Sequence, residues 1–282
     1  MSKLPTRPAF HASPENTRKA LEGQDARIES GLAARPWTAA RLRGLQTLSL
    51  DAAARRASAD PADPLIARDL ERAACAGAGL FAAVAAGAGA ELETPVPGGE
   101  GTATTSGAAP DPRVADPIDW RSSLLCALAV RHPRATELLA TVPAATLQAL
   151  APADPEWTTL ERAALQAFAL RRPDAGDRLL DAARAADPAT VPEISRDWVL
   201  DVVSPSLQLA FRALARDQAG FDTWIVAAVK GHHHYYQGRA ERKRSALSQL
   251  ALAPLAMACV ARDLGVSTTI TSDYLPRHLI ER

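Results

Sequence analysis

The sequence has no excess of charge of either sign. Its 32 Lys and Arg residues balance 32 Asp and Glu residues over 282 positions. Proteins that bind nucleic acids or anionic membranes through charge usually carry a clear excess of one sign. We therefore expect neither a nucleic acid nor a membrane as the partner of this chain.

Cysteines and long apolar runs are also scarce. Cys75, Cys126 and Cys259 lie far apart among Ala and Leu, a pattern typical of small buried residues in a reducing compartment. The stretches 73–90 and 250–260 are mostly Ala and Gly or too short to span a bilayer. Residues 1–14 contain charges and prolines without the apolar core of a secretory signal. We expect a soluble, cytoplasmic protein.

The short motifs of common enzymes are missing. The sequence contains no G-x-S-x-G, no H-E-x-x-H and no G-x-x-x-x-G-K-[ST], and no G-x-G-x-x-G follows a predicted strand. The glycine-rich stretch 98–101 has no strand before it and no helix directly after it. We expect no catalytic residue and no cofactor, and an enzyme of unrecognised type remains an alternative.

Helical patterns fill most of the chain. They predict an all-α fold, an irregular helical bundle or an α-solenoid-like stack of helical hairpins, without a fixed-period repeat. Pro205 should kink or divide the long helix expected over 194–215, and Pro254 interrupts the one expected over 245–264. Residues 266–272 are β-branched enough for a strand, but an isolated strand has no partner, so a short extended C-terminal arm is expected.

Composition divides the chain into three parts. Residues 1–94 form an N-terminal helical segment. Residues 95–116, rich in Pro, Gly and Thr with almost no apolar bulk, are expected to form a flexible linker or loop. Residues 117–282 form the main helical domain.

Half of the six histidines and two of the three tyrosines lie in the run His232-His233-His234-Tyr235-Tyr236. Ligand pairs on a helix usually lie three or four residues apart, and these offsets reach no Asp, Glu, Cys or other His. We therefore expect no metal site. Helical offsets instead place His232 and Tyr235 at the edge of one apolar stripe, and His233 and Tyr236 on a second.

Two further segments follow this cluster at characteristic spacing. Residues 250–265 read LALAPLAMACVARDLG, and residues 271–280 read TSDYLPRHLI. Together with an H-x-x-Y-Y-like cluster before them, they make the region 217–282 resemble the immunity protein 49 family of bacterial polymorphic-toxin systems, which is common in actinomycetes. His232 is our choice for the family's histidine position.

The resemblance implies a non-enzymatic protein that binds and neutralises a cognate toxin domain. Aromatic and arginine anchors are the side chains that such an interface needs, which makes Tyr235, Tyr236, Tyr274 and Arg277 candidates, with His232 and Asp273 as further motif residues. The competing interpretation is that Tyr274 only pins the terminal arm onto the last helices.

Two other functions remain open. One is a helical scaffold or adaptor that binds a peptide or protein ligand, and the other is a metal-dependent enzyme centred on residues 232–236. The basic run 239–244 is explained by a solvated surface or by a small patch that contacts an acidic partner. Because the chain is neutral, it does not indicate the class of toxin.

Overall fold

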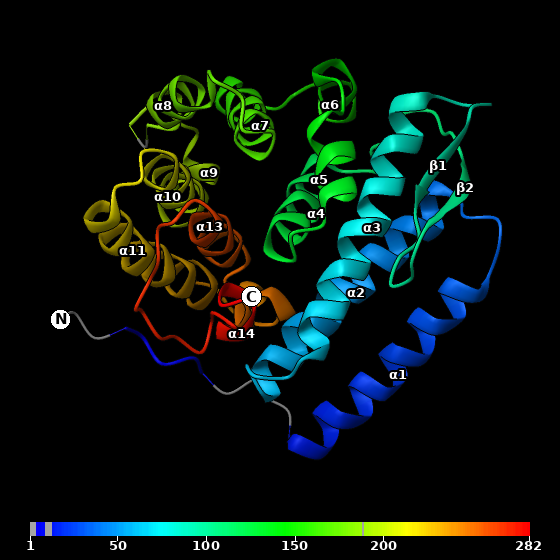
Figure 1. Cartoon of the computed structure of the whole chain (residues 1–282), viewed down its shortest axis with the longest axis horizontal. Helices are drawn as coiled ribbons and strands as arrows, with labels where there is room; N and C mark the ends of the chain where they lie inside the picture. Colours follow the sequence, from blue (N-terminus) through cyan, green and yellow to red (C-terminus); the bar gives the residue numbers. More distant parts are fainter. Residues whose placement is uncertain (1–3, 9–12, 188) are drawn as a thin grey trace. The chain divides into compact units, whose positions relative to one another are not determined.

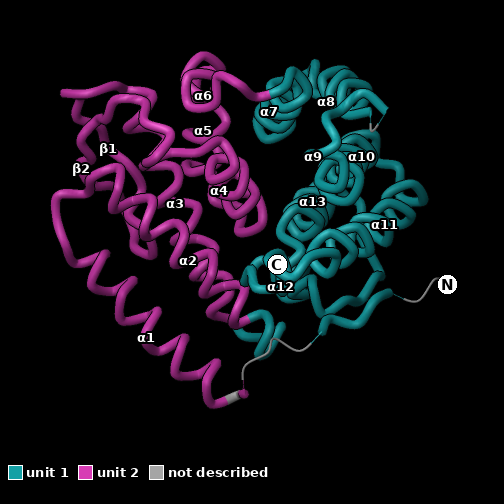
Figure 2. Tube along the Cα trace, turned by 180° about the vertical axis from the view of Figure 1, so that it is seen from behind, with its two compact units in different colours: residues 1–11, 57–63, 155–282 teal, residues 12–56, 64–154 magenta. Residues whose placement is uncertain are grey.

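The computed structural model describes residues 4–8, 13–187 and 189–282, and its elements are almost all helices (Figure 1). The prediction of an all-α fold is confirmed. Two compact units divide the chain (Figure 2): unit 1 comprises Met1–His11, Ala57–Asp63 and Pro155–Arg282, and unit 2 comprises Ala12–Arg56 and Pro64–Asp154. Within the described residues, no helix combines the length and the apolar character needed to cross a membrane.

Unit 2 is built around one buried helix. Its helices are α1 (Pro14–Ala33), α2 (Ala39–Ala59, whose last residues belong to unit 1), α3 (Leu65–Ala86), α4 (Pro117–Ala129), α5 (Pro133–Ala140) and α6 (Ala144–Leu150). Helix α3 is apolar on nearly every side, and almost all of it is buried, as expected for a helix of that composition. A Cβ at its Gly77 would lie 2.0 Å from Ser123 Oγ, so glycine permits the close packing of α3 on α4.

Helix α1 is held largely by polar contacts. Its most deeply buried side chains are Gln24 and Ile28, and Asp25 accepts two hydrogen bonds from Arg56 of α2 at 2.6 and 2.7 Å. The same guanidinium donates to the buried Asp69 of α3 at 2.7 Å. Arg56 therefore joins α1, α2 and α3, a contact that the spacing of apolar residues along the sequence does not predict.

The segment expected to be a flexible linker contains regular structure. Strands β1 (Glu91–Pro95) and β2 (Thr102–Ser106) pair antiparallel, with Glu91 opposite Ser106 and Pro95 opposite Thr102. The Oγ1 atoms of Thr94 and Thr105 lie 2.7 Å apart, both side chains are buried, and β1 packs against α3. The hairpin forms because β-branched Thr suits a strand and because Gly98 and Gly101 supply φ values of 73° and 85° in the connection. Residues on both sides of it belong to unit 2.

Unit 1 contains the remaining helices. They are α7 (Glu156–Ala169), α8 (Ala175–Ala185), α9 (Glu193–Trp198), α10 (Ser204–Leu214), α11 (Gln218–Gln237), α12 (Ala240–Lys243), α13 (Leu252–Asp263) and α14 (Arg277–Ile280). Helix α13 is buried over most of its length. Residues 266–276 contain no helix, and this stretch is the C-terminal arm that the sequence predicted.

Prolines alter two of the expected helices in unit 1. A π-helical turn, Val199–Val203, separates α9 from α10, because Pro205 has no N–H to donate to the carbonyl of Asp201. The helix expected over 245–264 is divided into a 3₁₀ turn, Ala246–Gln249, and α13. Pro254 lies in the first turn of α13, where its missing N–H leaves no helical hydrogen bond unmade.

Candidate functional site

Helix α11 carries the His–Tyr cluster at its C-terminal end. Asp217 caps the start of the helix, its carboxylate accepting the N–H of Gly220 at 2.9 Å. The buried face then runs through Phe221, Ile225, Ala228, Val229 and His232 at helical offsets. Tyr235 and Tyr236 are half-buried, so the cluster begins in the core and ends at the surface.

His232 is a core residue. Its ring lies 4.7 Å from that of Tyr236 and 5.2 Å from that of Tyr274, measured between centroids. Burial lowers the pKa of His232 to about 4; a backbone hydrogen bond at Ser248 opposes this shift, and the neighbouring His233 adds to it. Nε2 has no hydrogen-bond partner among the described residues. At neutral pH the imidazole is therefore uncharged and packs as an aromatic ring.

Tyr274 holds the C-terminal arm against α11. Its side chain is buried, and its hydroxyl lies 2.8 Å from Nδ1 of His233. Burial raises the pKa of Tyr274 to about 12; Arg7 opposes this shift, and Asp273 adds to it. The backbone carbonyl of Tyr274 accepts the N–H of Ala251, so side chain and backbone both fix the arm. This geometry agrees with the competing interpretation, in which Tyr274 pins the arm.

The N-terminal segment reinforces the same arm. Arg7 donates to the carbonyls of Asp273 at 2.7 Å, Ser58 at 3.1 Å and Gln249 at 3.3 Å. The side chain of Asp273 itself is exposed. Arg277 is also exposed and pairs with Glu281, the residue that follows α14.

The third histidine binds a different partner. Nδ1 of His234 lies 2.7 Å from Oδ2 of Asp201, in the π-helical turn. The backbones approach closely here, because a Cβ at Gly231 would lie 2.3 Å from the carbonyl oxygen of Asp201. Asp201 thus contacts α11 twice: its carboxylate meets His234, and its backbone carbonyl packs against the backbone at Gly231.

The three adjacent histidines therefore point to three places. His232 faces the core, His233 faces Tyr274, and His234 faces Asp201. This divergence follows from the rotation of about 100° between neighbouring residues of a helix. In the part of the chain that the structure describes, no three His, Cys, Asp or Glu residues gather in a way that could hold a metal ion.

The outer end of the cluster contains residues that the sequence did not single out. The rings of Trp198 and Tyr235 meet edge to face at 5.1 Å, and the Arg242 guanidinium lies 3.9 Å from the Tyr235 ring centroid. Arg242 also donates to Asp197 at 3.2 Å and to the carbonyl of Tyr235 at 3.3 Å. Arg242 follows the end of α11 at Gly238, so no helical offset relates it to Tyr235. The one feature of the sequence that pointed to Arg242 was the basic run 239–244.

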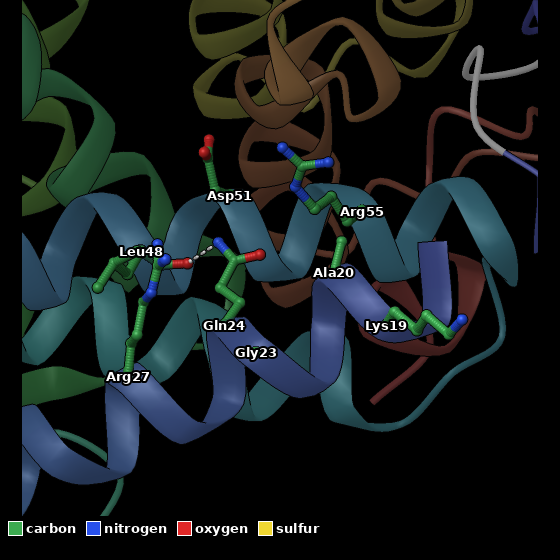
Figure 3. Close-up of a pocket in the computed structure, with 8 residues that line it drawn as sticks. All are labelled: Lys19, Ala20, Gly23, Gln24, Arg27, Leu48, Asp51 and Arg55. Carbon is green, nitrogen blue, oxygen red and sulfur yellow. Dashed lines mark hydrogen bonds between the residues drawn. The ribbon is translucent and has the colours of Figure 1, made fainter. Parts of the chain in front are cut away.

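A separate pocket of about 420 Å³ lies between α1 and α2 in unit 2 (Figure 3). The amide of Gln24 donates to the carbonyl of Leu48 at 2.7 Å within it. Burial raises the pKa of the Asp51 carboxyl, and Arg55 beside it opposes this shift. The remaining lining residues are Lys19, Ala20, Gly23 and Arg27. None of the residues that the sequence nominated lines this pocket.

Comparison with known proteins gives one informative result. Residues 56–279 match the model of a family described as immunity protein 49. Neither the search of curated proteins nor that of solved structures returned a match. The matched range includes the whole His–Tyr cluster and the C-terminal arm, and it extends far upstream of the region 217–282 in which the resemblance was seen. Because the match covers most of the chain, this protein belongs to the immunity protein 49 family.

Proposed function

We propose that this chain is a cytoplasmic bacterial immunity protein that neutralises the toxin of its own polymorphic-toxin system by binding it. The observation that carries the proposal is the family match over residues 56–279. An immunity protein protects the producing cell and its siblings, either by covering the active site of the toxin or by holding the toxin inactive. Neither mode requires this chain to catalyse a reaction.

The contacts of the His–Tyr cluster support a binding role. His232 packs as a neutral ring, His233 meets the Tyr274 hydroxyl, and His234 meets Asp201. Each imidazole thus has a structural task, and together they fix α11 and the arm in one arrangement. A rigid scaffold of this kind lowers the entropy lost when a partner binds.

Burial separates the candidate residues into two groups. His232 and Tyr274 are buried and hold the scaffold, so their effect on a partner would be indirect. Tyr235 and Tyr236 are half-buried, and Asp273 and Arg277 are exposed, so these four can touch a partner.

The proposal is tested by co-expression. We expect the toxin domain to be encoded beside this chain's gene, and it is expressed from an inducible promoter in a bacterial host, with this chain or with an empty vector. We expect the toxin to arrest growth alone and growth to resume with the chain present. A core variant, Ile225→Asp, places a carboxylate on the buried face of α11 and should lose protection by failing to fold. Equal killing with and without the wild-type chain would contradict the proposed function.

A further inference from the structure

Three side chains in unit 1 form a half-exposed surface that we call the aromatic platform: Trp198, Tyr235 and Arg242. Tyr235 is at its centre. Trp198 meets the Tyr235 ring at 5.1 Å and an angle of 65°, Tyr236 meets it at 5.2 Å and 88°, and the Arg242 guanidinium lies 3.9 Å from its centroid. Arg242 is itself fixed, because it donates to Asp197 and to the carbonyl of Tyr235.

These contacts prepare Tyr235 for recognition. Its ring is held on three sides, so binding would freeze little additional motion. Its hydroxyl has no hydrogen-bond partner among the described residues and is not buried, which leaves a donor and an acceptor for a partner. Trp, Tyr and Arg are the residue types that dominate binding energy at protein interfaces, where a few anchored side chains carry most of it.

Positive charge lies beside the platform, in the run 239–244, which also contains one exposed acidic residue, Glu241. Arg239, Lys243 and Arg244 are exposed and form what we call the basic rim. Among the described residues Arg239 pairs only with Asp197, at a long 3.7 Å, and Asp197 already accepts two hydrogen bonds from Arg242. Lys243 and Arg244 make no ion pair with any residue that the structure describes. The rim therefore has donors that its own neighbourhood does not satisfy, although the chain as a whole is neutral.

We propose that the aromatic platform and its basic rim dock an acidic surface of the toxin. Tyr235 is the central anchor, and carboxylates of the toxin meet Arg239, Lys243 and Arg244. This assignment rests on the proposed function and adds to it the surface used and the chemistry of the partner. The platform favours a protein over a nucleic acid: its rings lie edge to face against one another, and Arg242 covers one face of Tyr235, which leaves less open ring surface for bases to stack on.

The test is calorimetric titration of the purified chain with the toxin domain encoded beside its gene, inactivated in its own active site. Tyr235→Ala should weaken binding about 30-fold or more, the effect typical of a central anchor. Tyr235→Phe keeps the ring and should weaken binding about 5-fold if the hydroxyl is used. A thermal melt of each variant confirms that it is folded.

A charge reversal keeps the test independent of ring packing. The double variant Arg239→Glu and Lys243→Glu should weaken binding about 10-fold and flatten its dependence on salt. The matched control, Arg178→Glu and Arg184→Glu on α8, changes the net charge equally within the same unit and should leave binding within about 2-fold, as expected for charges outside the interface.

Each outcome decides between assignments. If neither Tyr235→Ala nor the rim variant (Arg239→Glu with Lys243→Glu) weakens binding, the platform is not the docking surface. If the α8 control loses as much affinity as the rim variant, the effect is one of long-range charge alone, and the assignment is again wrong. Tighter binding of a 20-nucleotide single-stranded RNA than of the toxin, lost in the rim variant, would assign the surface to nucleic acid. No binding by the wild-type chain would instead contradict the proposed function, and the platform assignment would fall with it.

Discussion

Acid should destabilise this protein through His232. The imidazole has a pKa of 6.5 in the unfolded chain and about 4 in the fold, chiefly because it is buried. Folding therefore requires the neutral ring, and between these two values the unfolded chain binds the additional proton. The stability that depends on the neutral ring is fully present above pH 6.5 and is lost as the pH falls toward 4.

The size of this effect follows from linkage. One pKa unit corresponds to about 1.4 kcal/mol. The difference between the two pKa values therefore lowers the free energy of unfolding by about 2 kcal/mol at pH 5 and by about 3 kcal/mol at lower pH. Burial lowers the pKa of His233 and of His278 as well, and both therefore add to the loss in the same direction. Against a typical total stability of about 5–15 kcal/mol, the contribution of His232 alone is measurable.

The assay is urea unfolding at pH 7.5, 6.0 and 5.0 for the wild-type chain and for His232→Gln. The variant keeps a polar side chain of similar length without the titrating ring. We expect the variant to be less stable than the wild type at pH 7.5. On going to pH 5, its free energy of unfolding should fall by about 2 kcal/mol less than that of the wild type. Equal losses in the two proteins, or an NMR titration of the His232 ring with a midpoint near 6.5, would refute this explanation.

Three other outcomes follow from the contacts. Gly231→Ala should destabilise the protein by about 1–3 kcal/mol in thermal unfolding, because the added Cβ would meet the carbonyl of Asp201. Its control, Gly176→Ala, has open space around the added Cβ and should leave stability unchanged or raise it. Arg56→Ala should destabilise by about 3–5 kcal/mol in urea unfolding, since it leaves a buried carboxylate without its main partner. Burial raises the pKa of the Cys75 thiol to about 12, so this cysteine should resist a disulfide reagent at pH 8 until the chain unfolds.

Local patterns in the sequence were enough to predict the helical fold and the place of the His–Tyr cluster. The buried face of α11 follows helical offsets, which placed His232 at the edge of an apolar stripe and separated the three histidines; the structure buries His232 more deeply than that. The arm was predicted from the isolated β-branched run 266–272, and residues 266–276 contain no helix. These features depend on residues close together in the chain, and periodicity can therefore report them.

Contacts between distant residues were not predictable in the same way. His234 and Asp201 are 33 positions apart, and their pairing depends on the π-helical turn that Pro205 permits. Arg7 reaches carbonyls more than 200 positions away. The hairpin of β1 and β2 escaped prediction because its threonines supply β propensity without the apolar alternation by which strands are recognised.

The most direct test of the central claim is a titration of toxin activity. The active toxin domain, which we expect to be encoded beside this chain's gene, is assayed on its own substrate at a fixed concentration while the purified wild-type chain is added. We expect activity to fall in proportion to the added chain and to disappear at a fixed molar ratio. Activity that stays unchanged at a large excess of folded chain would contradict neutralisation by binding.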